Sequence, residues 1–201
     1  MAASYLAARR PVLLLIDLQQ GMVEGPSEWG PRSTPNLTTN VEKLLKYWRK
    51  NAWPVLHVQH DDVADPTNII NAKYPETFKI HASAAPIEGE PVFVKNVGSA
   101  FVGTELNDAL EGMGTKGKGK IYVAGMDSSQ CINNTTRNGS DLGYDIIVVS
   151  DACAGYGMQD LKGKLVDAET THEMAMSMLL GYAKVWTTEV IVTPIGASGS
   201  K

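Results

Sequence analysis

Short apolar runs alternate with amphipathic stretches along most of this chain. Residues 12–16 are apolar without interruption, as expected for a strand that is buried on both faces of a sheet. Similar patterns predict further strands at 53–58, 91–95, 121–124, 144–149 and 183–187. Apolar side chains three or four residues apart predict helices at 35–48, 103–110, 128–142 and 167–182. In the last helix, we expect Met174, Met178 and Leu179 to share one apolar face.

Strands that alternate with helices at this spacing predict an α/β fold. The expected architecture is a three-layer sandwich with a mostly parallel central sheet of the Rossmann type. We expect residues 1–195 to form a single domain and the Gly/Ser-rich residues 196–201 to form a flexible tail. Residues 61–90 are polar and contain three prolines, which predicts a long surface excursion. Loops of this length are usually functional, often as a lid or a subunit contact.

Composition narrows the choice of protein class. The formal charge of −4 argues against a nucleic-acid partner, and no apolar run approaches the ~20 residues that cross a bilayer. The apolar run at 12–16 is too short and wrongly flanked for a signal peptide. Two cysteines without such a signal favour free thiols in a reducing compartment. We therefore expect a cytoplasmic protein that acts on a small molecule.

The predicted topology places several reactive side chains at one edge of the sheet. Ligands of parallel sheets bind outside the carboxyl ends of the strands, where Asp17, His60, Lys95 and Cys131 would meet. Cys131 follows a short polar turn just inside a predicted helix, where the helix dipole and free N–H groups favour a thiolate. The alternative is that Cys131 is a small buried apolar residue, as most free cysteines are.

A carboxylate, an ammonium and a thiol together suit nucleophilic catalysis. Asp17 would take the proton of Cys131 and later give it to a leaving group, while Lys95 would orient Asp17 and favour the thiolate. An ordinary ion pair beside a core cysteine is the alternative. Asp17 and Lys95 each end an apolar strand, where an ionised group is costly without a task or a partner, and this favours a functional role.

Several motifs in this order resemble one known family. They are Leu-Leu-Ile-Asp-Leu-Gln at 14–19, Lys-Asn-Val-Gly-Ser-Ala-Phe at 95–101, the segment 124–135 around Cys131, and the segments 143–152 and 167–172. Over residues 11–192 the chain is similar to the cysteine hydrolases of the isochorismatase-like superfamily. That superfamily includes nicotinamidases, N-carbamoylsarcosine amidohydrolase, and ureido and biuret hydrolases.

The resemblance implies roles for particular residues. It implies a catalytic triad of Asp17, Lys95 and Cys131, and an oxyanion hole formed by the backbone N–H groups of Asp127 and Cys131. A cis peptide would join Met126 to Asp127. It also suggests a homo-oligomer. We expect no cofactor. Candidates for the substrate pocket are Gln19, Trp29, His60 and Phe101.

Two positions depart from the family pattern. The residue four before the cysteine is usually small and apolar, whereas here it is Asp127, whose carboxylate should point away from the sulfur. Nicotinamidases carry an Asp-x-His…His metal site after the second strand. The spacing of His57 and His60 does not match that site, and residues three apart on a strand face opposite sides. We therefore expect neither a metal site nor nicotinamidase activity.

The predicted function is cysteine-dependent hydrolysis of a C–N bond in a small amide or ureido substrate, through a thioester on Cys131. One alternative is an isochorismatase-type vinyl ether hydrolase, which needs no nucleophilic cysteine. The other is a non-catalytic member of the fold that binds a ligand or senses redox state through Cys131. The substrate itself is not predicted, because specificity would lie in loops 20–35 and 61–90 and in a partner subunit.

Overall fold

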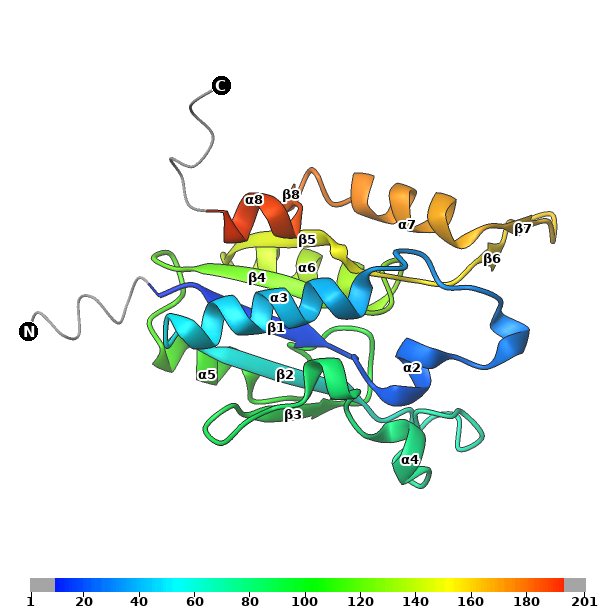
Figure 1. Ribbon diagram of the computed structural model, residues 1–201, viewed down its shortest axis with the longest axis horizontal. Helices are drawn as coiled ribbons and strands as arrows, with labels where there is room; N and C mark the ends of the chain where they lie inside the picture. The colour runs from blue at the N-terminus through cyan, green and yellow to red at the C-terminus, as the bar shows by residue number, and fades with distance from the viewer. Residues whose placement is uncertain (1–9, 194–201) are drawn as a thin grey trace, which may run out of the picture.

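A six-stranded sheet forms the centre of the computed structural model, which describes residues 10–193 (Figure 1). Its order is β3-β2-β1-β4-β5-β8, and every neighbouring pair runs parallel. The strands are β1 (Val12–Ile16), β2 (Val55–His60), β3 (Val92–Lys95), β4 (Lys120–Gly125), β5 (Asp145–Cys153) and β8 (Lys184–Trp186). The predicted α/β fold with a parallel central sheet is confirmed.

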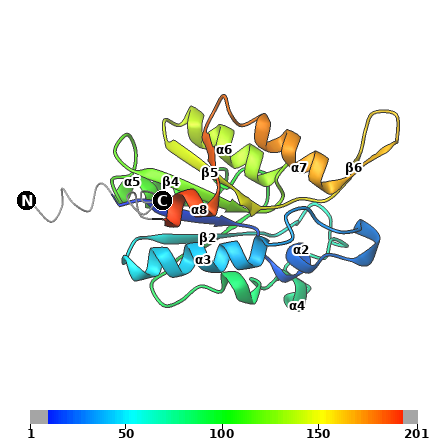
Figure 2. The same cartoon turned by 45° about the horizontal axis from the view of Figure 1, so that its top comes forward.

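Helices cover both faces of this sheet (Figure 2). Helices α3 (Leu37–Lys50) and α8 (Thr188–Val192) pack on one face, and α5 (Leu106–Gly112), α6 (Cys131–Asp141) and the end of α7 (Ala168–Ser177) pack on the other. Side chains of β1 pack on both faces of the sheet. Leu13 and Leu15 face α3, whereas Val12, Leu14 and Ile16 face α6. A strand buried on both faces has no solvent side, which explains its unbroken apolar sequence.

Helix α7 differs from its predicted pattern. It ends at Ser177, and both Met174 and Met178 are more than half exposed. The prediction that these methionines share one apolar face with Leu179 is wrong, since Leu179 is fully buried. Small residues such as Ala175 bring the helix close to α6, and the two methionines therefore remain outside the contact.

Short elements gather at the carboxyl ends of the strands, on the side where α2 (Gln20–Glu24) and α4 (Pro75–Phe78) lie (Figure 1). The predicted excursion at 61–90 contains α4 and a 3₁₀ turn, η2 (Ala82–Ala84), and a second 3₁₀ turn, η1 (Ser27–Trp29), follows α2. An antiparallel hairpin of β6 (Met158–Gln159) and β7 (Leu165–Val166) extends on the same side.

The expected flexible tail at 196–201 lies outside the described residues. Within residues 10–193, no helix has the length and apolar character needed to cross a bilayer.

Candidate active site

Four reactive side chains meet at the carboxyl edge of the sheet. His60 and Lys95 are the last residues of β2 and β3 and stand opposite each other in the parallel register. Asp17 follows β1 with a φ of 52°, a left-handed conformation that is uncommon and costly for a residue with a Cβ. Cys131 is the first residue of α6. The structure thus brings together the four residues that the topology predicted to meet.

The ammonium of Lys95 lies at the centre of this group and is fully buried. Its Nζ atom is 2.8 Å from Asp17 Oδ2, 2.7 Å from His60 Nδ1 and 3.2 Å from Cys131 Sγ. An ammonium has three hydrogens, so each of them has one acceptor here. This complete set of bonds offsets the cost of taking the charge out of water.

A metal ion does not fit this arrangement. Asp17, His60 and Cys131 offer potential ligand atoms that lie within 4.8 Å of one another. All three atoms already converge on the positive charge of Lys95, and a second cation would lie against a buried ammonium.

His60 is held as a neutral ring with a defined tautomer. Burial lowers its pKa, and the charge of Lys95 lowers it further. Because Nδ1 accepts a hydrogen bond from the ammonium, the ring proton is on Nε2. The backbone of His60 is fixed by Gln19, whose amide donates to the carbonyl at 3.1 Å and accepts from the N–H at 2.8 Å.

Gln19 was predicted to line the substrate pocket. In the structure it instead binds the backbone of His60. Its side chain is fully buried and clamps the end of β2.

The sulfur of Cys131 rests as a thiol. Burial raises the pKa of this thiol to about 12, and the negative charge of Asp17 raises it too, while Lys95 opposes the shift. Lys95 thus favours the thiolate, as expected, but the desolvation of the buried sulfur has the larger effect on this pKa. Such a thiol needs a base at the moment of attack.

Asp17 has one oxygen available for that task. Its Oδ2 atom is paired with Lys95, whereas Oδ1 is buried and has no hydrogen-bond partner among the described residues. Burial raises the pKa of Asp17, and the charge of Lys95 counteracts this rise. A buried, unpaired carboxylate oxygen beside a thiol is suited to accept its proton.

The turn before Cys131 presents two free backbone donors. The peptide between Met126 and Asp127 is cis, as the resemblance implied. Within the described residues, the N–H groups of Asp127 and Cys131 have no acceptor, and both residues line the cavity next to the sulfur. Two unpaired N–H groups at one point are the requirement for an oxyanion hole.

The carboxylate of Asp127 is engaged within its own surroundings. It accepts hydrogen bonds from Ser129 N and Oγ, both at 2.7 Å, and from Tyr156 N at 3.2 Å. These bonds direct the charge toward Ser129 and Tyr156, which agrees with the expectation that it points away from the sulfur.

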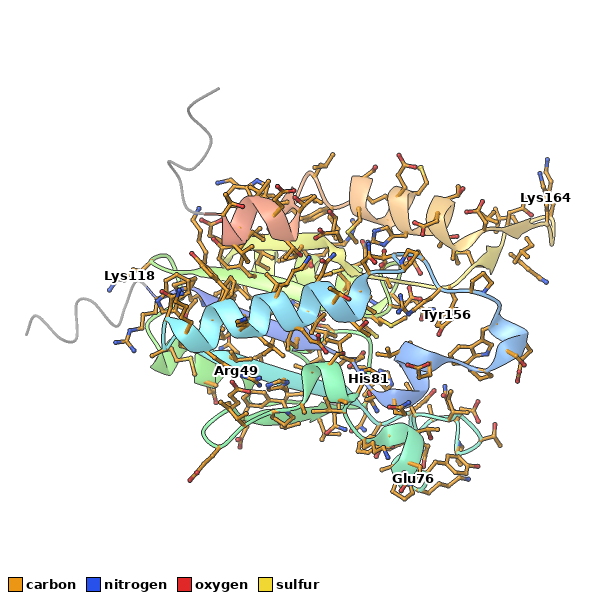
Figure 3. All side chains as sticks on the ribbon, in the orientation of Figure 1. Arg49, Glu76, His81, Lys118, Tyr156 and Lys164 are labelled. Atoms are coloured by element: carbon orange, nitrogen blue, oxygen red, sulfur yellow. The ribbon has the colours of Figure 1, made fainter. Side chains whose placement is uncertain are left out.

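A cavity of about 610 Å³ opens over Cys131. Trp29 and Tyr156 form part of its wall, with ring centroids 5.1 Å apart and the rings edge to face. The Tyr156 hydroxyl donates to the carbonyl of Met22 in α2, and Figure 3 labels Tyr156 in this region. His60 also lines the cavity. Trp29 and His60 thus lie where the sequence placed them.

Phe101 was also predicted to line the pocket, but it lies outside the cavity. Its ring stacks on Tyr144 with centroids 5.5 Å apart and packs against Gly139 of α6. It is partly buried and packs against the hydrophobic core on the α6 side of the sheet. Phe101 is therefore not among the residues that line the cavity, contrary to the prediction, because Ser99 and Ala100 beside it are hydrogen-bonded to side chains of α6.

Comparison with known proteins identifies the family. Residues 11–190 match the model of the isochorismatase domain. The chain belongs to the isochorismatase family. It is 37% identical to the isochorismatase family protein YddQ of Bacillus subtilis, over 90% of this chain and 97% of that protein. A crystal structure of an isochorismatase-family hydrolase from Chromobacterium violaceum, 32% identical, superposes with a TM-score of 0.83 over 93% of this chain and 94% of that one.

Some relatives of this isochorismatase-family hydrolase have names that state a reaction. N-carbamoylsarcosine amidase of Arthrobacter is 26% identical over 81% of this chain and 69% of its own length.

Sequence reasoning missed two features of this isochorismatase-family site. His172 of α7 lies 2.7 Å from the buried Ser128 hydroxyl and so ties that helix to the turn before Cys131. Tyr156 lines the cavity from the segment after β5. The segment 167–172 matched the family without indicating this contact, and nothing in the local pattern around Tyr156 pointed to the cavity.

Proposed function

We propose that this protein is a cysteine-dependent hydrolase that cleaves the C–N bond of a small amide or ureido substrate. The proposal rests mainly on two neighbouring groups. Cys131 is a thiol with a raised pKa, and Asp17 has a buried oxygen without a hydrogen-bond partner that can take the thiol proton. The ammonium of Lys95 contacts both side chains and fixes their positions relative to each other. The similarity to an amidase supports a C–N bond as the one that is cleaved.

In the first half of the reaction, Asp17 Oδ1 accepts the proton of the Cys131 thiol as the sulfur attacks the substrate carbonyl carbon. The carbonyl oxygen becomes an oxyanion and is bound by the N–H groups of Asp127 and Cys131. When this intermediate collapses, the C–N bond breaks and Asp17 returns its proton to the departing nitrogen. The products of this half are an amine or ammonia and a thioester on Cys131.

In the second half, water replaces the amine. Asp17 takes a proton from the water as its oxygen attacks the thioester carbonyl, and the same two N–H groups bind the new oxyanion. The C–S bond then breaks, the sulfur recovers the proton from Asp17, and the carboxylic or carbamic acid leaves. One water is consumed and the resting thiol is restored.

The alternatives fit these contacts less well. Vinyl ether hydrolysis requires no nucleophile from the protein, since water attacks the substrate, so it would leave the bonded arrangement of thiol, ammonium and carboxylate without a task. A redox sensor needs an exposed sulfur with a low pKa, whereas burial raises the pKa of Cys131 to about 12.

A substrate screen combined with cysteine variants tests the proposal. Simple amides, ureas and hydroxamates would be incubated with the protein while release of ammonia or amine is measured. We expect Cys131→Ala and Cys131→Ser to lose at least about 10³-fold in kcat. Cys153→Ala is the matched control, because it removes the other thiol, which is fully buried in the core, and should keep activity. Turnover retained by Cys131→Ala would exclude the thioester route.

A further inference from the structure

The cavity over Cys131 has a one-sided charge. Among its lining residues none is Lys or Arg, whereas four are acidic, namely Asp17, Glu28, Asp62 and Asp127. A cavity lined by one sign of charge attracts ligands of the other sign and repels those of its own. The inference that follows rests on the proposed function, since it concerns the substrate of the same site.

Two of the four carboxylates are already compensated. Asp17 forms an ion pair with Lys95, and Asp127 accepts three hydrogen bonds from Ser129 and Tyr156. The other two carboxylates are not compensated by a positive charge. Within residues 10–193, neither Glu28 nor Asp62 has an ion-pair partner.

Asp62 lies two residues beyond His60. Its oxygens accept hydrogen bonds only from uncharged groups, the Asn68 side-chain amide at 2.8 Å and the Asp65 backbone N–H at 3.2 Å. Glu28 lies in the exposed turn η1, next to Trp29. One carboxylate therefore lies near the reacting groups and the other lies on the loop that closes the cavity wall.

The cationic side chains near the cavity bind other groups or point away from it. Lys95 donates to its three acceptors beneath the cavity. Arg32 follows the Trp29 turn, but its guanidinium donates to three backbone carbonyls within residues 23–34. Lys164, on the β6–β7 hairpin, points away from the body of the molecule (Figure 3). Among residues 10–193, these cations therefore leave the charges of Glu28 and Asp62 without an ion-pair partner.

The aromatic wall favours the same kind of ligand. Trp29 and Tyr156 meet edge to face in the cavity wall, and aromatic ring faces attract cations. Carboxylates combined with Trp and Tyr rings are the groups with which proteins bind ammonium and guanidinium ions. This observation is independent of the acidic residues and points to the same charge.

We propose that the substrate is an amide or ureido compound with a positively charged ammonium or guanidinium group remote from its scissile C–N bond. The scissile carbonyl lies at Cys131, while the charged end lies among Asp62, Glu28 and Trp29. Amides that carry a carboxylate at that end are poor substrates, because the cavity offers them no cation and two uncompensated like charges.

Three primary amides of equal chain length test the proposal. They are 5-aminopentanamide, 5-hydroxypentanamide and 5-carbamoylpentanoate, whose far ends are an ammonium, a hydroxyl and a carboxylate. Ammonia release by the wild-type protein gives kcat/KM for each. We expect the ammonium compound to exceed the carboxylate compound by at least about tenfold, with the hydroxyl compound between them. Equal values, or a preference for the carboxylate, would overturn the proposal.

Glu28→Gln and Asp62→Asn locate the charge preference. Each should lower the ratio of kcat/KM between the ammonium and hydroxyl compounds by about threefold or more, and added salt should weaken the wild-type preference. Glu88→Gln removes the same charge from an exposed position outside the cavity lining and should leave the ratio as it is. A ratio that is unchanged in the Glu28 and Asp62 variants would reject the assignment.

Binding separates this proposal from the proposed reaction. Calorimetric titration of the Cys131→Ala protein with the three amides reports charge preference without turnover. If the wild-type protein hydrolyses none of the amides but Cys131→Ala binds the ammonium compound most tightly, the reaction is wrong and the charge assignment stands. If amides are hydrolysed without regard to charge, the reaction stands and the charge assignment fails.

Discussion

Lys95 is the residue on which the geometry of the site depends, since its ammonium is the one group that contacts Asp17, His60 and Cys131 alike. A buried ammonium costs several kcal/mol in desolvation unless its hydrogens are bonded. Each of the three neighbours therefore stabilises the charge and is oriented by it in return. Loss of one acceptor should affect both stability and turnover.

His60 provides a test of this mutual dependence. In His60→Ala, one Lys95 hydrogen loses its acceptor, which should cost about 1–3 kcal/mol of unfolding free energy and lower kcat by roughly tenfold or more. His60→Asn is the matched variant, because its side-chain oxygen can replace Nδ1, and it should retain more of both. Urea unfolding and steady-state kinetics measure the two effects. A His60→Ala protein with wild-type stability and kcat would contradict this role.

The raised pKa of Cys131 makes a prediction about its reactivity. Only the thiolate is alkylated by iodoacetamide, and a pKa of about 12 keeps its fraction very small at neutral pH. The alkylation rate of Cys131 should therefore rise about tenfold per pH unit from pH 7 to 10 without a plateau. Peptide mass spectrometry distinguishes Cys131 from Cys153. A plateau below pH 9 would mean that the resting sulfur is an activated thiolate.

Among the secondary-structure elements, β1 and β4 approach each other closely where their carboxyl ends meet the site. Gly125 ends β4 with a φ of 136°, and a Cβ at this position would overlap the carbonyl oxygen of Ile16. The strand irregularity between Val123 and Gly125 lies at the same point, immediately before the cis peptide. Only glycine satisfies both the backbone conformation and the contact.

Gly125→Ala should therefore destabilise the protein severely, by about 3 kcal/mol or more, or prevent folding. Gly112→Ala is the control, since a Cβ there meets nothing within 4 Å at the end of α5. It should be neutral or stabilising by up to about 1 kcal/mol. Thermal unfolding of the two variants is the measurement, and equal melting temperatures would contradict the close approach.

Glu90 joins α3 to the start of β3. Burial alone would raise the pKa of its carboxyl, but hydrogen bonds from Arg49, labelled in Figure 3, and from His57 lower it to about 2. Because the folded pKa is lower than the ordinary value of 4.5, the stabilisation is complete above pH 4.5 and is lost as the pH falls toward 2.

Glu90→Gln should lower the unfolding free energy at pH 7 by about 1–3 kcal/mol. The difference between wild type and variant should shrink as the pH falls below 4.5. Urea titrations at pH 7, 5, 4 and 3 follow this difference, and Glu88→Gln, on the same loop but exposed, is the control. A difference that grows toward acid pH would contradict the assignment.

Helix α8 shows where element prediction from local sequence fails. Its β-branched residues give no helical signal, so the segment 188–192 was not predicted as a helix. The carboxylate of Asp151 accepts hydrogen bonds from the N–H and hydroxyl of Thr188, which fixes the start of the helix, while Ile191 and Val192 pack on the α3 side. These contacts come from a distant strand, and tertiary packing overrides local propensity.

At the scale of the whole molecule, the sheet and the meeting of four residues at its edge were predictable, because parallel topology brings the carboxyl ends of strands together. The tasks of individual side chains were not. Gln19 and Phe101 lie in motifs that match the family, yet Gln19 is hydrogen-bonded to the backbone of His60 and Phe101 packs against the core. The thiol's pKa depends on burial, which is a property of the folded molecule and has no local sequence signal.

In the proposed reaction, Cys131 carries the acyl group of the substrate as a thioester. Rapid acid quenching during turnover of an amide, followed by intact-protein and peptide mass spectrometry, tests it most directly. We expect an added mass equal to the acyl group, mapped to Cys131 and absent from both Cys131→Ser and the untreated protein. An acyl group on another residue, or undiminished turnover by Cys131→Ser, would contradict it.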